Sequence, residues 1–256
     1  MVVTGASRGI GAAIARRFAA EGARVVAGAR TLDASTPSPY PGTLAETVAA
    51  IHDAGGDALA VRCDLTQPDD RASLIAVARD AYGPVDVLVN NAAASWARPF
   101  DDFPAKQYGV MFDVHVRSAF ELAQLVVPDM KAAGAGWILN LTSGASHDPE
   151  GPPYGPPLGA ASTLVYAMCK AALERFTTGL AAELWEQRIA VNALAPSKAV
   201  LTYGMNHPPV DPDDTERIEP ADDTAAAALA LCSWDPREVT GRVTDTAAVL
   251  GTTARP

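Results

Sequence analysis

The chain has 256 residues and a formal net charge of −10, from 20 Lys and Arg against 30 Asp and Glu. Hydrophobic residues make up 48% and charged residues 20%, which excludes a largely disordered chain and suffices for a full core. The acidic balance argues against nucleic acid or an anionic membrane as a partner, because both require a basic surface. The sequence has no apolar run of about 18 residues and no signal-peptide pattern. Its three cysteines have no metal-site spacing and fit a reducing compartment, so we expect a cytoplasmic protein without a metal.

Short apolar runs alternate with amphipathic segments along the chain. The runs predict strands at Val2–Thr4, Arg24–Ala29, Ala58–Cys63, Val85–Asn90, Trp137–Leu141, Ile189–Ala193 and, more weakly, Arg242–Leu250. The amphipathic segments predict helices at Ile10–Glu21, Leu44–Ala54, Arg71–Tyr82, Lys106–Ala133, Val165–Glu186 and Asp222–Ser233. Continuously apolar strands that alternate with helices indicate an α/β fold. We expect one domain over residues 1–256, with a doubly wound, mostly parallel seven-stranded sheet and helices on both faces.

Three segments rich in proline, glycine or acidic residues interrupt this alternation. They are 31–42, 146–162 and 207–220, and each is either a substrate-contacting lid or a variable surface loop. The first predicted strand begins only one residue after Met1. We therefore expect that the natural chain starts a few residues earlier.

A glycine-rich turn joins the first predicted strand to the first predicted helix. Its sequence is Thr4-Gly5-Ala6-Ser7-Arg8-Gly9-Ile10-Gly11, with spacing G-x-x-x-G-x-G. Glycines let the backbone approach a pyrophosphate, and the helix N-terminus offers free N–H groups and partial positive charge. At this place in an alternating chain, the pattern predicts a dinucleotide site.

The end of the second predicted strand carries no carboxylate that could accept hydrogen bonds from a ribose 2′-hydroxyl. Arg30 and Thr31 stand there instead, and Arg8 of the glycine turn can point to the same place. Two arginines favour a 2′-phosphate. The alternative is that Arg30 only caps an exposed loop. We predict a preference for NADP(H), with NAD(H) less favoured.

Tyr166 and Lys170 are four residues apart on a predicted helix and share one face of it. The glycine turn is followed in chain order by Asp64-Leu65, Asn90-Asn91-Ala92-Ala93, Ser143 and the Tyr166/Lys170 pair. This set of motifs resembles that of the short-chain dehydrogenase/reductase family, over essentially the whole chain. The resemblance implies a Rossmann-type fold and a catalytic centre of Ser143, Tyr166 and Lys170. The alternative is that Thr142 plays the part of Ser143 and that Ser143 only caps a strand end.

The resemblance also assigns roles to these residues. Tyr166 would exchange a proton with the substrate oxygen, and Ser143 would orient that oxygen. Lys170 would bind the nicotinamide ribose and lower the pKa of Tyr166. The implied cofactor-binding residues are Gly5, Ser7, Arg8, Gly9, Ile10, Gly11, Arg30, Thr31, Asp64, Leu65, Asn91, Ala92, Ala93, Tyr166, Lys170, Pro196 and Thr202.

Several residues depart from the family pattern. His115 stands where the family usually has a relay asparagine. It could act in the relay and titrate near neutrality, or be a buried structural histidine. Ala93 replaces a usual glycine, and Pro196-Ser197 replaces a usual Pro-Gly. The spacing from Ser143 to Tyr166 is also longer than usual, because of the proline- and glycine-rich insertion.

These features point to a dehydrogenase or reductase acting on a carbonyl and secondary-alcohol pair. The chain also resembles the hydroxysteroid-dehydrogenase-like branch of the family, without the sterol-carrier domain that some members carry. A neutral, hydrophobic small molecule fits the candidate pocket residues Ala94, Trp96, Ser143, Ala145, Tyr154, Leu158, Leu201, Tyr203 and Met205. A homodimer or homotetramer follows from the resemblance. The alternative function is a cofactor-binding redox sensor or assembly protein with little turnover.

Overall fold

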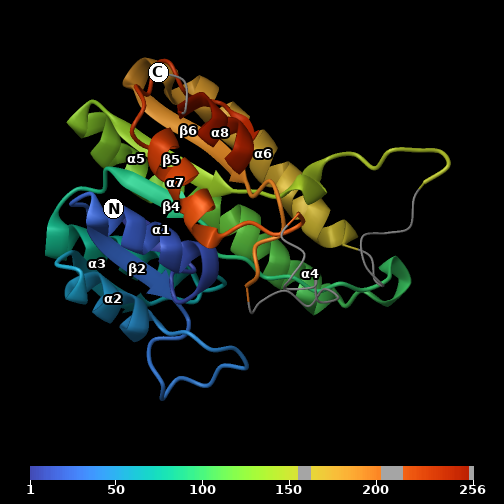
Figure 1. The fold of residues 1–256 in the computed structure, drawn as a ribbon, viewed down its shortest axis with the longest axis horizontal. Coiled ribbons are helices and arrows are strands. Elements are labelled where there is room, and N and C mark those ends of the chain that lie inside the picture. The colour runs from blue at the N-terminus through green and yellow to red at the C-terminus, as the bar shows by residue number, and fades with distance from the viewer. Residues whose placement is uncertain (155–162, 203–215, 254–256) are drawn as a thin grey trace.

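The computed structural model describes residues 1–154, 163–202 and 216–253. Seven strands of these ranges form one parallel sheet in the order β3-β2-β1-β4-β5-β6-β7 (Figure 1). The strands are β1 (Val2–Thr4), β2 (Arg24–Ala29), β3 (Asp57–Arg62), β4 (Val87–Asn90), β5 (Gly136–Leu141), β6 (Ile189–Ala195) and β7 (Val243–Asp245). All neighbouring pairs run parallel, so the predicted doubly wound sheet is confirmed.

Helices cover both faces of the sheet (Figure 1). They are α1 (Gly9–Ala20), α2 (Leu44–Asp53), α3 (Pro68–Tyr82), α4 (Ala105–Phe112), α5 (Ser118–Ala133), α6 (Leu164–Leu184), α7 (Ala221–Leu231) and α8 (Thr246–Thr253). Buried residues of α1, α2, α7 and α8 share one apolar cluster, and those of α3, α5 and α6 share another. Each cluster fills one side of the sheet.

Neighbouring strand residues point to opposite sides of the sheet and enter different clusters. Val3 packs with α1 and α7, whereas Val2 packs with α3 and α5. In β5, Leu139 belongs to the same cluster as Val3, and Ile138 belongs to the same cluster as Val2. Both faces are therefore dry, as the continuously apolar runs predicted.

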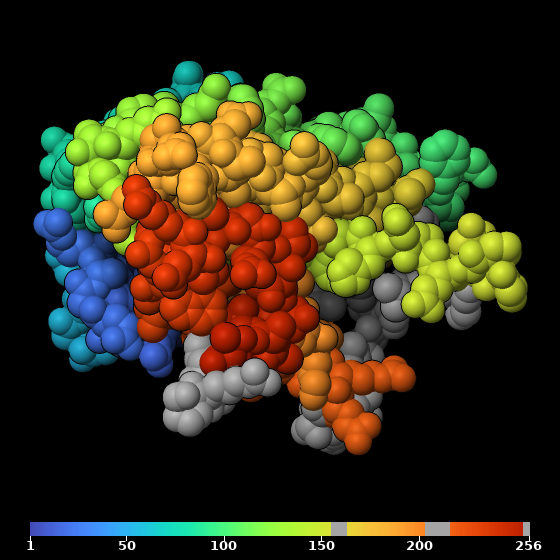
Figure 2. Space-filling model, turned by 90° about the horizontal axis from the view of Figure 1, so that it is seen from above, coloured from blue at the N-terminus to red at the C-terminus, as the bar shows by residue number. Residues whose placement is uncertain are grey.

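The C-terminal part of the chain packs against its beginning. Ala225, Ala227 and Ala228 of α7 lie in one cluster with Ala13 and Ile14 of α1. The small alanines let the two helices approach closely. Figure 2 shows this segment, coloured red, beside the blue N-terminal helix.

Two predicted elements differ from the structure. The run Arg242–Leu250 forms a strand only over β7, because Asp245 accepts a hydrogen bond from the Ala248 amide (3.0 Å) and starts α8. The single helix predicted over Lys106–Ala133 is divided by a π-helical turn at Asp113–Arg117. Apolar periodicity does not distinguish a π turn from an α turn, and such turns occur often at functional sites.

A buried polar network ties α6 to the middle of the sheet. Asn90 of β4 donates to the Asn140 side chain (2.9 Å), and Asn140 of β5 donates to Thr177 of α6 (2.8 Å). All three side chains are buried. The network fixes α6 relative to the carboxyl ends of β4 and β5. Between β1 and β4 the strand order reverses, which is where parallel α/β sheets bind ligands.

Candidate active site

The glycine turn follows β1 and leaves no room for side chains. Gly5 and Gly9 have φ of +68° and +56°. A Cβ atom on Gly11 would lie 2.4 Å from the Asn91 side chain and from the Gly5 carbonyl oxygen. At the N-terminus of α1, no side chain of the described residues caps the helix. The turn therefore presents uncapped backbone N–H groups in a shape that only glycine allows, which fits a pyrophosphate.

Thr4 and Asn91 lock this turn to the end of β4. The Thr4 hydroxyl accepts hydrogen bonds from the amides of Asn91 (3.0 Å) and Ala92 (3.2 Å). The Asn91 side chain donates to the carbonyl oxygens of Thr4 (2.9 Å) and Gly5 (3.3 Å). Asn91 thus supports the turn from behind, and Ala92 lies directly against Gly5.

Arg8 and Arg30 come close together beside the loop 31–42. Arg8 donates to Thr31 (3.0 Å), Ser38 (3.2 Å) and the Gly42 carbonyl oxygen (2.8 Å), so it holds this loop on the glycine turn. Burial, followed by the nearby charge of Arg30, lowers the pKa of Arg8. Arg30 itself is exposed. The arrangement concentrates positive charge at the end of β2, next to the buried Thr31.

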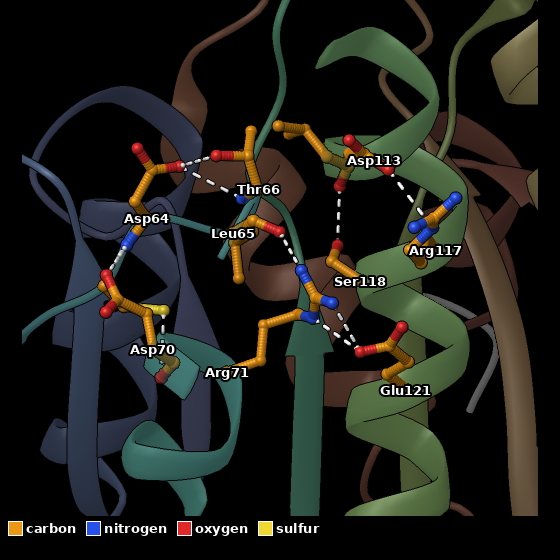
Figure 3. Close-up of polar contacts among 11 residues, drawn as sticks. Asp64, Leu65, Thr66, Asp70, Arg71, Asp113, Arg117, Ser118 and Glu121 are labelled. Atoms are coloured by element: carbon orange, nitrogen blue, oxygen red, sulfur yellow. Dashed lines mark hydrogen bonds and ion pairs between the residues drawn. The ribbon is translucent and has the colours of Figure 1, made fainter. Parts of the chain in front are cut away.

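Asp64 and Leu65 lie in the turn after β3 (Figure 3). The Asp64 carboxylate accepts hydrogen bonds through Oδ1 from the Thr66 amide (3.0 Å) and hydroxyl (2.9 Å). In the part of the chain that the structure describes, its Oδ2 accepts none. One carboxylate oxygen is therefore available to a ligand with a hydrogen-bond donor.

Ser143, Tyr166 and Lys170 meet at the carboxyl end of β5. The Ser143 side chain is close enough to the Tyr166 phenol to lower its pKa. Lys170 is buried, donates to the Leu141 carbonyl oxygen (2.6 Å), and has its Nζ 5.5 Å from the centre of the Tyr166 ring. An ammonium group has three donors, so two remain for other partners.

The protonation states of this group are set by burial. Burial raises the pKa of Tyr166, although the hydrogen bond from Ser143 acts in the opposite direction. Desolvation of the phenolate is the largest of these effects, so the pKa of Tyr166 lies above its usual value. The lowering expected from Lys170 together with the charge of the oxidised nicotinamide stays a prediction. Burial also lowers the pKa of Lys170 to about 8. At neutral pH, Tyr166 is a protonated phenol and most Lys170 side chains carry a charge.

His115 lies in the π-helical turn and faces the loop after β4. Its Nε2 is 2.8 Å from the Ala94 carbonyl oxygen and 3.2 Å from the Ala94 amide, and the shorter contact places the proton on Nε2. Its ring meets the Tyr166 ring edge-on, with centroids 5.5 Å apart. Burial lowers the pKa of His115 to about 3, which favours the alternative of a buried, neutral histidine over one that titrates near neutrality. Nδ1 is buried and has no partner among the described residues.

Glu174 belongs to this site although the sequence analysis missed it. Its Oε1 accepts hydrogen bonds from Thr142 (2.5 Å) and Ser146 (2.6 Å), on either side of Ser143. Thr142 is thereby engaged with Glu174, whereas Ser143 acts on the pKa of Tyr166. The signal was present, because Glu174 follows Lys170 by four residues on the same helix face.

The remaining predicted residues lie around the same edge of the sheet. Thr202 lies against the glycine turn, where its methyl group would be 2.8 Å from a Cβ atom on Gly9. Pro196 directly follows β6. Ala94 and Trp96 pack with Tyr166 around Met111. Tyr154 and Leu201 are exposed, whereas Leu158, Tyr203 and Met205 lie outside the described residues.

Metal-binding clusters and membrane-spanning helices are both absent from residues 1–154, 163–202 and 216–253. No group of three or more His, Cys, Asp or Glu side chains in these ranges could hold a metal ion. None of their helices has the length and apolar character needed to span a membrane.

Known proteins resemble this chain in sequence. Residues 1–207 match the short chain dehydrogenase family. The 7alpha-hydroxysteroid dehydrogenase of Escherichia coli (strain K12) is 33% identical over 249 residues, which cover 94% of this chain and 90% of that protein. Hydroxysteroid dehydrogenase-like protein 2 of Xenopus tropicalis is 32% identical over 94% of this chain and 55% of its own length.

Solved structures resemble it in fold as well. A 7 alpha-hydroxysteroid dehydrogenase complexed with NADH and 7-oxo glycochenodeoxycholic acid has a TM-score of 0.80 and 33% identity, and covers 95% of this chain and 91% of that one. A metagenomic short-chain oxidoreductase in complex with NADP has a TM-score of 0.75 and 29% identity, with 95% of both chains covered. With the glycine turn and the Ser143, Tyr166 and Lys170 group, these likenesses show that the chain belongs to the short-chain dehydrogenase/reductase family, the nicotinamide-dependent oxidoreductases that act on CH–OH groups.

Proposed function

We propose that the protein interconverts a hydrophobic ketone and its secondary alcohol with NADP(H), in the cytoplasm. The observation that carries this proposal is the placement of Tyr166 beside Ser143 and the buried Lys170, at the same sheet edge as the glycine turn. When bound, the nicotinamide supplies or accepts the hydride. The protein's own residues hold the reactants and move the proton.

Tyr166 acts as the general acid when the ketone is reduced. Its raised pKa keeps the phenol protonated at neutral pH, so the proton is in place before the carbonyl oxygen gains charge. Ser143 shares a hydrogen bond with this phenol and orients the same oxygen. In the oxidation direction, the Lys170 cation stabilises the phenolate that must form.

His115 serves the site as a neutral group. Its Nε2 contact with Ala94 fixes the loop after β4, and its ring supports Tyr166 from the side. The bare Nδ1 can accept one hydrogen bond, so it can orient a proton-carrying group of a relay while the imidazole itself neither gains nor loses a proton.

The predicted cofactor residues would hold NADP(H) along this edge of the sheet. Gly5, Gly9 and Gly11 with the α1 N-terminus would bind the pyrophosphate, and Asp64 and Leu65 the adenine. Arg8, Arg30 and Thr31 would bind the 2′-phosphate, since the end of β2 offers two guanidinium groups. Ser7, Ile10, Asn91, Ala92, Ala93, Pro196 and Thr202 would line the remaining length.

The substrate is proposed to be neutral and hydrophobic. Trp96 and Ala94 lie beside Tyr166 in an apolar cluster with Val165. The similarity to hydroxysteroid dehydrogenases makes a steroid-like ketone a reasonable first choice. A screen in which only free carboxylic acids are turned over would contradict this.

We also propose that the protein is a homodimer or homotetramer. Phe120 of α5 is 47% exposed and stacks at an angle on Phe176 of α6, with ring centroids 5.8 Å apart. Exposed aromatic pairs of this kind are typical of subunit interfaces. Light scattering of the purified protein should give a multiple of 26.5 kDa, and a monomer mass would contradict the proposal.

Replacing Tyr166 with Phe tests the general acid. Tyr166→Phe should lower kcat for ketone reduction by about 10²-fold or more, because it removes only the proton donor. NADPH binding, measured by fluorescence, should stay within twofold. Tyr82→Phe is the matched control, since it also removes a hydrogen-bonded hydroxyl (2.6 Å to Asp57) but far from the site. Equal rates for Tyr166→Phe and the wild type would instead favour a cofactor-binding sensor.

The pH dependence of kcat/KM tests the state of Lys170. Lys170 loses its proton as the pH rises through its pKa of about 8. The rate of ketone reduction should therefore be level between about pH 6 and 7.5 and fall above about pH 8, approaching tenfold per unit. His115 should add no step near pH 6.5, because its pKa is about 3. A profile that is level to pH 10 would rule out a role for this cation.

Replacing Arg30 with Ala tests the cofactor preference. Arg30→Ala should weaken NADPH binding by about tenfold or more and leave NADH binding unchanged, because only NADPH carries the 2′-phosphate. Arg17→Ala, which removes an exposed arginine of α1, serves as the control. Wild-type protein that binds NADH as tightly as NADPH would contradict the proposal.

A further inference from the structure

Arg71 is the largest fully buried side chain of the described residues, with only 1% of it exposed. It lies near the start of α3, where the helix dipole disfavours a positive charge. Burying a guanidinium is also unfavourable unless it is paired and hydrogen-bonded. The position of Arg71 in α3 therefore does not explain why its charged side chain is buried. The explanation must lie in its contacts with other elements.

Two contacts of Arg71 join α3 to α5. Its Nε and Nη2 donate to Glu121 Oε2, at 2.8 Å and 2.5 Å (Figure 3). The Glu121 side chain is 35% exposed, so the carboxylate stays partly hydrated while the guanidinium is dry. The pair fixes the planar guanidinium group in one orientation.

The third contact of Arg71 reaches the turn after β3. Its Nη1 donates to the Leu65 carbonyl oxygen at 2.5 Å. The preceding residue, Asp70, accepts a hydrogen bond from the Asp64 amide at 2.7 Å. Consecutive residues of α3 thus hold the Asp64 amide and the Leu65 carbonyl from below (Figure 3).

We propose that Arg71 is a positioning residue that preforms the adenine-binding turn Asp64–Thr66 through its ion pair with Glu121. The inference rests on the proposed function, in which Asp64 and Leu65 bind adenine. Glu121 orients Arg71, and Arg71 fixes the peptide that carries both side chains. A preformed turn loses less conformational freedom when the ligand binds, so the ligand binds more tightly.

A second ion pair between the same helices provides a matched control. Arg79 donates to Asp129 at 2.8 Å and 3.0 Å and to the Leu125 carbonyl oxygen at 2.5 Å. These residues lie about two turns further along α3 and α5. Arg79 makes the same kind of link between the helices but contacts no part of the Asp64–Thr66 turn.

The test compares Arg71→Met with Arg79→Met in the full chain. The adenosine half of the cofactor is probed by calorimetry with 2′,5′-ADP, and turnover is measured at saturating NADPH. Arg71→Met should raise the Kd for 2′,5′-ADP and the KM for NADPH about tenfold and leave kcat within twofold. Arg79→Met should change neither value by more than twofold. Arg71→Lys keeps the charge but not the planar guanidinium group, so it should give a Kd between those of the wild type and Arg71→Met. It replaces Arg71→Met in the test if that variant does not fold.

Two results would overturn the inference. One is an unchanged Kd for 2′,5′-ADP in Arg71→Met, or in Arg71→Lys if only that variant folds. The other is an equal loss of affinity in the Arg79→Met control, which would indicate a general effect of loosening α3 and α5. Failure of the proposed function looks different, because the wild-type protein would then bind neither 2′,5′-ADP nor NADPH.

Discussion

The hydroxyl of Thr4 connects β1 and β4, the two strands between which the strand order of the sheet reverses. It accepts hydrogen bonds from the first two amides after β4, while Asn91 returns two hydrogen bonds to the glycine turn. This contact places the loop after β4 beside the glycine turn. Ala94 of this loop in turn contacts His115 of the π-helical turn. The network from Asn90 through Asn140 to Thr177 continues the connection to α6, which carries Tyr166 and Lys170. Polar groups at the carboxyl ends of the central strands therefore place the glycine turn and the residues proposed to react close together.

The charge of the whole chain and the charge of its site have opposite signs. The net charge is −10, yet Lys170 and Arg71 are both buried, and Arg30 is near enough to Arg8 for its charge to lower the pKa of Arg8. Each buried cation meets an oxygen acceptor, at Leu141 for Lys170 and at Glu121 and Leu65 for Arg71. Burial moves the pKa values of Tyr166 and Lys170 apart, upward for the phenol and downward to about 8 for the amine. The protein thus holds a protonated phenol beside a cation that can be neutralised by a modest rise in pH.

The sequence was sufficient for the features that depend on local patterns. Apolar runs predicted the strands to within a few residues, and glycine spacing placed the turn between β1 and α1, where close approach to Asn91 leaves space for hydrogen atoms only. Features that depend on distant contacts were not predictable. Nothing in the sequence near Arg71 indicates that Glu121, from another helix, would bury it. The choice between the two alternatives for His115 could not be made for the same reason, since burial by other elements and the charge of Lys170 determine its pKa.

In the proposed reaction, a hydride passes from NADPH to a carbonyl carbon while Tyr166 supplies the proton. The most direct measurement is mass spectrometry of the alcohol formed from a steroid-like ketone with NADPH deuterated at C4 of the nicotinamide, once on each face. Labelling of one face should place one deuterium on the carbinol carbon of the product, and labelling of the other face should place none. Turnover in D₂O with unlabelled NADPH should leave that carbon unlabelled. An alcohol without deuterium from either labelled cofactor would contradict the account.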